Sequence, residues 1–230
     1  MQSMVIAVTG GLGVLGRAVV DAARRAGWEA AAIDHATAPE DDLGGADDGV
    51  LRIGGIDLAG PAAASAAMER VVARFGRLDA LINVAGGFRW QTLADGPFEG
   101  WAALYAMNVL TAAASSRAAL PHLVASGRGA IVNVGANAAL KAGAGMGAYA
   151  AAKSGVHRLT EALAEEWKGK VRVNAILPSI LDTPANRADM PRADQAAWVS
   201  PEEAAQVILF LAGERASAIT GALLPVTGRV

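Results

Sequence analysis

Residues 4–16 of the chain read MVIAVTGGLGVLG, a short apolar run that ends in a glycine-rich turn. Residues 17–27, RAVVDAARRAG, follow with helical periodicity and a glycine stop. We therefore expect a strand, a tight turn and a helix. Such a junction directs free backbone N–H groups and the positive end of a helix at one spot, which can hold a pyrophosphate. The residues predicted to bind a dinucleotide there are Gly10, Leu12, Gly13, Leu15 and Gly16.

The next apolar run, residues 29–33, ends at Asp34. A carboxylate at this point of a second parallel strand accepts hydrogen bonds from the adenosine ribose and repels a 2′-phosphate. The sequence therefore predicts NAD(H) as the preferred cofactor, with NADP(H) as an alternative. The other interpretation of Asp34 is that it only caps the strand. Residues 37–49 are acidic and contain glycine, and they predict an exposed loop.

Strands and helices are expected to alternate along the rest of the chain. The further strands are predicted at residues 50–53, 78–84, 130–134, 171–177 and 223–226, and the further helices at 61–75, 98–126, 147–167 and 201–212. This pattern predicts an α/β fold, a Rossmann-type doubly wound parallel sheet with helices on both faces, as a single domain over residues 1–230. Residues 178–199 contain several prolines and are interpreted as a long irregular segment, of which residues 179–199 are expected to cover a substrate.

Small residues follow the strand expected at 78–84, and small residues at a strand end indicate backbone close to a ligand. Phe88 and Trp90 come next and either wall a pocket for a flat ring or anchor the loop. The residues predicted to contact the cofactor from this loop are Ala85, Gly86 and Gly87, joined by Asp57 and Leu58 after the strand at 50–53.

Residues 135–153, GANAALKAGAGMGAYAAAK, run from a glycine-rich loop into a helix that presents Tyr149 and Lys153 one turn apart. A free phenol, with a pKa of ~10, is a poor acid at neutral pH, and a cation held beside it lowers that pKa. We predict that Tyr149 donates a proton and that Lys153 lowers its pKa. The alternative for such a pair on its own is a solvated helix face.

The composition limits the possible classes of partner. The chain has 230 residues, of which 53% are hydrophobic, but no apolar run is long enough to cross a bilayer. Met1 to Met4 show no secretory signal, so a cytoplasmic protein without a membrane partner is expected. The net charge of −2 and the lack of a Lys/Arg run argue against nucleic acid and favour a small molecule.

No metal site is predicted. The chain has no cysteine, which excludes disulfides and thiolate ligands. His35, His122 and His157 are far apart in the sequence and have no metal-ligand spacing. We predict a surface or capping role for each of the three.

The order of these motifs resembles that of the short-chain dehydrogenase/reductase family over essentially the whole chain. The matching positions are Thr9 to Gly16, Asp34, Asp57, Asn83 to Gly86, Asn108, Tyr149 to Lys153, and Pro178 to Thr183. The resemblance implies that Tyr149 is the general acid/base and that Lys153 also binds the nicotinamide ribose. It further implies that Asn108 holds water or the lysine in a proton relay. Cofactor contacts are implied for Pro178, Ile180 and Thr183.

The chain departs from the family pattern at three positions. Gly13 stands one residue before the usual glycine, Val84 replaces an asparagine, and Ala136 occupies the position of the catalytic serine. A methyl group cannot donate a hydrogen bond to a substrate oxygen. Either the substrate needs no such donor, or another group such as Asn137 or water replaces the serine.

One branch of the family, the dihydropteridine reductases, resembles the chain in these departures, uses NADH and lacks the serine. The likeness includes residues 84–87, 135–140 and 177–191, with Trp198. It implies reduction of a quinonoid dihydropterin or a similar conjugated substrate, which needs no oxyanion-stabilising serine. The predicted substrate contacts are Phe88, Trp90, Ala136, Asn137, Met146 and Asn186.

Two other functions stay open on the sequence. The first is a carbonyl or 3-oxoacyl-type reductase that acts on another ketone, and the second is a non-catalytic NAD(H)-binding sensor. Family members form dimers or tetramers, and the alanine-rich helices near residues 115–120 and 149–163 offer packing faces. A homodimer or homotetramer is therefore predicted.

Overall fold

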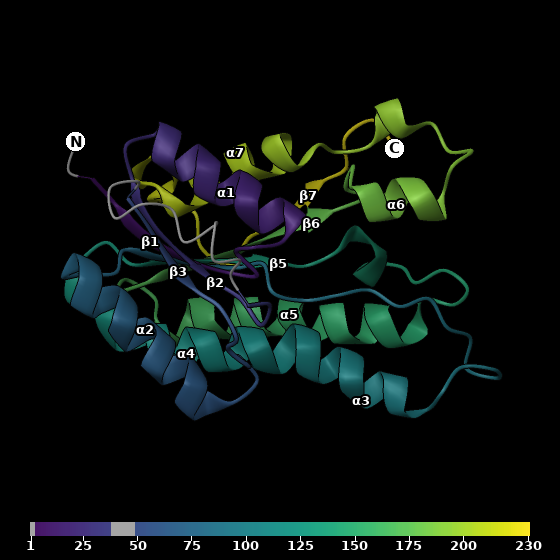
Figure 1. Cartoon of the computed structure of the whole chain (residues 1–230), viewed down its shortest axis with the longest axis horizontal. Coiled ribbons are helices and arrows are strands. Elements are labelled where there is room, and N and C mark those ends of the chain that lie inside the picture. The colour runs from purple at the N-terminus through teal and green to yellow at the C-terminus, as the bar shows by residue number, and fades with distance from the viewer. Residues whose placement is uncertain (1–2, 38–48) are drawn as a thin grey trace.

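The structure is a computed structural model that describes residues 3–37 and 49–230. Its centre is a seven-stranded sheet with the order β3-β2-β1-β4-β5-β6-β7, in which all neighbouring strands are parallel (Figure 1). The predicted doubly wound sheet is confirmed. The loop expected at residues 37–49 lies, apart from its two end residues, outside the described part of the chain.

The elements follow the predicted order closely. The strands are β1 (Val5–Thr9), β2 (Glu29–Ile33), β3 (Val50–Ile53), β4 (Ala80–Asn83), β5 (Ala130–Val134), β6 (Arg172–Pro178) and β7 (Leu223–Val226). The helices are α1 (Val14–Arg25), α2 (Pro61–Phe75), α3 (Glu99–Tyr105), α4 (Thr111–Ser126), α5 (Gly147–Glu166), α6 (Pro184–Asp189) and α7 (Pro201–Ala212). Short helical turns are η2 (Ala106–Leu110), η3 (Asn137–Ala139), η4 (Gln195–Ala197) and η5 (Glu214–Ala216).

Helices bury both faces of the sheet, which is why its central strands are apolar without alternation. Side chains of β1 point in turn to the two sides: Ile6 joins the core under α1 and α7, and Val5 joins the core under α2, α4 and α5. Figure 1 shows these two helical layers above and below the sheet. No helix among the described residues is long and apolar enough to cross a membrane.

The helix predicted at residues 98–126 is interrupted by η2, which is a turn of π-helix. Asn108 lies inside it, and its side-chain amide donates to the carbonyl oxygen of Leu104 at 2.9 Å. An amide that occupies a carbonyl one turn earlier competes with the ordinary helical ladder. The widened turn points Asn108 towards the end of β4.

The prediction of a long irregular segment at residues 178–199 is wrong for Pro184–Asp189, which form α6, and for Gln195–Ala197, which form η4. Pro178 ends β6, Pro184 begins α6, and Leu181 pairs with Val199 in a parallel bridge. The Thr183 hydroxyl caps α6 by accepting the N–H of Asn186 at 3.2 Å. Proline at the first position of a helix starts the helix, so the prolines of this segment do not exclude one.

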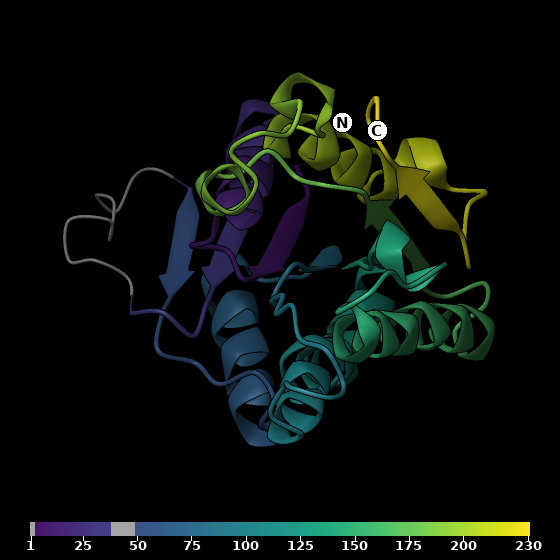
Figure 2. The ribbon, with the colours of Figure 1, turned by 90° about the vertical axis from the view of Figure 1, so that its right-hand side faces the viewer.

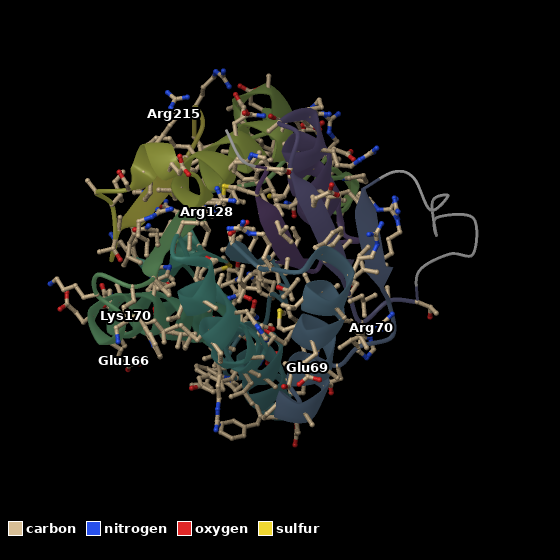
Figure 3. The ribbon with its side chains drawn as sticks, turned by 90° about the vertical axis from the view of Figure 1, so that its left-hand side faces the viewer. Glu69, Arg70, Arg128, Glu166, Lys170 and Arg215 are labelled. Carbon is tan, nitrogen blue, oxygen red and sulfur yellow. The ribbon has the colours of Figure 1, made fainter. Side chains whose placement is uncertain are left out.

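A buried ion cluster fixes the opposite end of the sheet, where the strands begin. Asp79 is fully buried and accepts hydrogen bonds from the Val5 amide at 2.9 Å and from Arg77 and Arg128. Burial alone would raise the pKa of Asp79, but hydrogen bonds from Arg128, Val5 and Arg77 hold it below its usual value. Figure 3 looks onto this end and labels Arg128. The cluster ties β1 to β4.

Candidate active site

The turn between β1 and α1 can receive a phosphate group. Helix α1 begins without a side-chain cap, so N–H groups of its first turn, including those of Leu15 and Gly16, are left for a ligand. The backbone is tightly folded there: Gly10 has a φ of +65°, and a Cβ at Gly16 would overlap the Gly10 carbonyl oxygen. These features fit a dinucleotide pyrophosphate.

Leu12 and Gly13, which were predicted to bind the phosphate, use their backbone amides in hydrogen bonds within the protein. The N–H of Leu12 donates to Asp34 Oδ2 at 3.0 Å, and the N–H of Gly13 donates to the Gly10 carbonyl at 3.1 Å. Neither amide is therefore available to a phosphate in this arrangement. The side chain of Leu15 is buried in the core, so only its backbone can contact a cofactor.

Asp34, at the end of β2, joins the turn to the position expected for a ribose. Its Oδ2 accepts from Leu12 and its Oδ1 accepts from the N–H of Ala36, each at 3.0 Å. Each carboxylate oxygen has a second lone pair for a ribose hydroxyl. The structural and the cofactor-binding interpretations of Asp34 are thus compatible.

Of the two residues predicted to contact the cofactor after β3, Asp57 and Leu58, only Asp57 has an exposed side chain. Asp57 is exposed and accepts the N–H of Ala59 at 3.0 Å. Leu58 is 3% exposed and belongs to the hydrophobic core, so its side chain cannot lie against an adenine. Leu58 can contact a cofactor only through its backbone.

Lys153 is a buried cation at the carboxyl end of β5. Its side chain is 5% exposed, and its Nζ donates to the carbonyl oxygen of Val134 at 2.8 Å. A Cβ placed on Gly86 would lie 3.3 Å from this Nζ and 2.5 Å from Asn108 Oδ1. The structure therefore brings Lys153, Asn108 and the glycines after β4 to one place.

Tyr149 lies one turn before Lys153 on α5, with its ring half-buried. The ring of Phe88 packs edge-on against it, with centroids 5.0 Å apart and an interplanar angle of 88°. No residue in the described part of the chain hydrogen-bonds the Tyr149 hydroxyl. The phenol is thus covered by an aromatic ring and keeps its O–H free to donate.

The lowering of the Tyr149 pKa that was expected from Lys153 is not found in the protein without a cofactor. Burial raises the pKa of Tyr149 to about 12 and lowers the pKa of Lys153 to about 8. Desolvation by burial causes both shifts, and the ammonium group is hydrogen-bonded to the Val134 carbonyl and not to the phenol. The protein therefore keeps Tyr149 protonated at neutral pH, the form that a proton donor requires.

Asn108 holds the loop after β4 instead of the lysine. Its Nδ2 donates to the Gly87 carbonyl at 3.1 Å, and its Oδ1 accepts the Gly87 N–H at 3.2 Å. With the bond to Leu104, both ends of the amide have protein partners. These bonds fix Gly87 close to the lysine, and the relay role of Asn108 stays a prediction.

The two aromatic residues of this loop have different roles. Trp90 Nε1 donates to the Ala144 carbonyl oxygen at 3.1 Å, and the N–H of Gln91 donates to the Gly145 carbonyl oxygen at 2.9 Å. Trp90 is therefore an anchor between two loops, whereas Phe88 forms a wall against Tyr149. Met146 is half-buried at the start of α5, next to the anchored loop.

Ala136 stands at the position of the family's catalytic serine, and its methyl group is buried. Ala136 is 4% exposed. Asn137, the next residue, is half-buried, and its side-chain amide has no hydrogen-bond partner among the described residues. Asn137 is the side chain on this segment that can still bind a substrate polar group.

Residues on the segment after β6 are partly committed to the fold. Asn186 Nδ2 donates to the Leu181 carbonyl at 2.8 Å, and its side-chain oxygen and second N–H stay available for the predicted substrate contact. The Thr183 hydroxyl accepts from Asn186, which leaves its O–H free to donate, as a carboxamide contact requires. Pro178 is buried at the end of β6, and Ile180 is half-buried two residues later. Figure 2 looks onto this end of the sheet, where α6 and the loops after β4 and β5 surround the carboxyl ends of the strands.

The prediction of a surface or capping role is wrong for His157. This side chain is 2% exposed, and its Nε2 accepts the N–H of Ala136 at 3.3 Å. The sequence spacing could have predicted this buried position, because His157 lies one helical turn after Lys153 and so shares its face of α5. His35 is exposed and His122 is partly exposed.

Comparison with known proteins adds a family and a set of relatives. The family model for short chain dehydrogenases matches residues 4–194. D-threitol dehydrogenase from Mycolicibacterium smegmatis is 34% identical over 242 residues, which cover 99% of this chain and 93% of that enzyme. The 3-oxoacyl-(acyl-carrier-protein) reductase FabG from Thermotoga maritima is 34% identical over 170 residues, 70% of this chain and 69% of that enzyme.

Solved structures with the same fold cover nearly the whole chain. The 3-ketoacyl-(acyl-carrier-protein) reductase from Brucella melitensis, solved with NADH, has a TM-score of 0.86 at 27% identity and covers 99% of this chain and 98% of its own. A short-chain type dehydrogenase/reductase from Mycobacterium ulcerans has a TM-score of 0.89 at 25% identity, with coverage of 100% and 90%.

Proposed function

The chain belongs to the short-chain dehydrogenase family and is an oxidoreductase, and from that premise we propose that it is an NADH-dependent reductase of a conjugated C=N or C=O compound, such as a quinonoid dihydropterin. The observation that carries this proposal is the buried methyl of Ala136, which stands at the position of the family's catalytic serine, while Tyr149 and Lys153 are both present. Reduction of a conjugated C=N system needs a proton donor but no hydroxyl to stabilise an oxyanion.

Residues of this chain are arranged to hold a nicotinamide dinucleotide. The first turn of α1 would bind the pyrophosphate, Asp34 the adenosine ribose, and Lys153 with Thr183 the nicotinamide end. The carboxylate of Asp34 favours NADH over NADPH, and the Brucella melitensis relative was solved with NADH. When bound, this cofactor supplies the hydride.

The chain itself supplies and controls the proton. Tyr149 keeps its proton at neutral pH because burial raises its pKa to about 12. Lys153 is positively charged below its pKa of about 8, and its ammonium group stabilises the phenolate that remains after proton transfer. The carbonyl of Val134 holds that ammonium group in place. Phe88 covers the phenol and excludes water from one side.

A second candidate is a carbonyl or 3-oxoacyl-type reductase. It is favoured by the names of the Thermotoga maritima and Brucella melitensis relatives. In this case the free amide of Asn137 would take the place of the serine hydroxyl. The non-catalytic sensor is not favoured, because the named relatives are enzymes and Tyr149 and Lys153 are both present.

Rates of NADH oxidation with a panel of substrates test this proposal. We expect kcat/KM with quinonoid dihydropterin to exceed that with simple ketones by at least ~10-fold. Ala136→Ser is expected to leave ketone reduction low, and Ala142→Ser, on the exposed loop, is the matched control. A gain of ~10²-fold on ketones in Ala136→Ser alone would instead favour the second candidate, because one oxyanion donor has an effect of that size.

We also infer a homodimer or homotetramer, formed through the alanine-rich helices α4 and α5 that the sequence indicated. Ser115, Ser116 and Leu120 are buried within the chain, so α4 would contribute only its outward residues, such as Arg117 and Ala118. Large apolar side chains are also exposed just before α4, at Tyr105 and Leu110. A light-scattering mass of a single 23.3 kDa chain would refute the oligomer.

A further inference from the structure

Two side chains one turn apart on α5 hold neighbouring parts of the same backbone segment. Lys153 Nζ donates to the Val134 carbonyl at 2.8 Å, and His157 Nε2 accepts the Ala136 N–H at 3.3 Å. Residues 134–137 form the end of β5 and the side of the proposed substrate site that lacks a serine. The place of this segment relative to Tyr149 therefore depends on both side chains.

The imidazole of His157 fits closely against the segment. It is 2% exposed, and a Cβ on Gly135 would lie only 2.5 Å from Nε2, so a residue larger than glycine cannot stand there unless the ring moves. Because Nε2 accepts a hydrogen bond, the neutral ring must carry its proton on Nδ1. The arrangement selects one protonation state of His157.

We propose that neutral His157 is a positioning residue for the reduction, which holds the peptide of Ala136 in place, and that protonation of His157 releases this peptide and stops turnover. The kinetic part of this inference rests on the proposed function. His157 contacts neither Tyr149 nor a predicted cofactor position in the hydrogen-bond pattern, and it acts through residues 134–136.

The chemistry of the bond explains why the charge state matters. A protonated Nε2 is a donor, and it would face the N–H of Ala136, which is also a donor. The buried amide then loses its partner, and the segment must move to avoid the contact. Because Val134 lies in the same segment, such a movement also displaces the carbonyl that anchors Lys153.

The surrounding charges favour the neutral ring. Burial lowers the pKa of His157 below 6.5, and the nearby charges of Arg158 and Lys153, both on α5, lower it further. Helix α5 packs against β5, β6, η2, η3 and α3. Of these, the strand β5 and the turns η2 and η3 carry no titratable side chain among the described residues, and β6 carries only Arg172, at its opposite end. Helix α3 carries Glu99 and Tyr105. The neutral form therefore predominates at pH 7 and is lost only as the pH falls below 6.5.

The kinetic test compares pH profiles of kcat for the wild type, His157→Gln and His122→Gln between about pH 5 and 8. A glutamine can accept the Ala136 N–H with its side-chain oxygen but cannot be protonated in this range. We expect kcat of the wild type and of the His122→Gln control to fall ~10-fold per pH unit on the acid side, and His157→Gln to lack this fall. An acid limb that is unchanged in His157→Gln would overturn the inference.

A second test does not depend on turnover. The backbone amide of Ala136, followed by ¹⁵N NMR without substrate, should shift with pH together with the His157 ring in the wild type and stay constant in His157→Gln. If this coupling is found but no dihydropterin or ketone is reduced, the proposed function fails and the positioning role stands. If the amide does not follow the ring, the positioning role fails whatever the substrate is.

Discussion

Replacement of Tyr149 by phenylalanine should lower kcat by at least ~10²-fold while the affinity for NADH stays nearly the same. The substitution removes only the phenolic oxygen, which has no hydrogen-bond partner among the described residues, so the fold loses no bond. The ring remains to pack against Phe88, whose centroid is 5.0 Å away. The expected loss therefore reports on proton donation alone.

Single-turnover kinetics and NADH titration by fluorescence measure these two quantities separately. Tyr105→Phe is the matched control, because Tyr105 is an exposed tyrosine on α3 and should tolerate the same change. An unchanged rate in Tyr149→Phe would remove this residue from the role of acid. A large loss of NADH affinity would instead assign it to cofactor binding.

Replacement of Lys153 by methionine should have opposite effects on activity and on stability. We expect kcat to fall by at least ~10²-fold, because the phenolate left after proton transfer loses its buried counter-charge. At the same time the free energy of unfolding at pH 7 should rise by about 2 kcal/mol. This value is the relief of about 3 kcal/mol for burying the ammonium, less about 1 kcal/mol for the lost hydrogen bond to Val134.

The gain in stability should depend on pH in a defined direction. The pKa of Lys153 is 10.5 without the fold and about 8 within it, so burial disfavours the charged form. Below pH 8 the lysine is charged in both states and the full penalty is present, and the penalty disappears as the pH rises from 8 to 10.5. Urea unfolding of Lys153→Met and of the exposed control Lys170→Met at pH 7 and 10 checks this. A destabilised Lys153→Met at pH 7 would contradict the assigned burial cost.

Most of the fold could be predicted because its signals are local. The strands are uninterrupted apolar runs, and helices such as α2 and α4 end at glycines, Gly76 and Gly127, with φ near +75°. The π-turn was not predictable, because it depends on a side-chain bond from Asn108 to Leu104. Helix α6 was missed because its proline looks the same in sequence whether it starts or breaks a helix.

The site could be predicted as a set of residues but not as a set of bonds. Parallel strands bring their carboxyl ends to one edge, so Asp34, Gly86 and Lys153 had to lie on the same side. Which amides were already used depended on the exact turn, as at Leu12 and Gly13. The contact of His157 with Ala136 depended on the packing of α5 against β5, which no local pattern shows.

The most direct test measures isotope effects on a single turnover of quinonoid dihydropterin reduction. If hydride transfer and proton donation by Tyr149 occur together in the measured step, NADH deuterated at C4 and D₂O as solvent should each slow the wild-type reaction. The solvent effect should disappear in the residual reaction of Tyr149→Phe. A wild-type rate that is insensitive to D₂O, or a solvent effect that persists unchanged in Tyr149→Phe, would contradict proton donation by this residue.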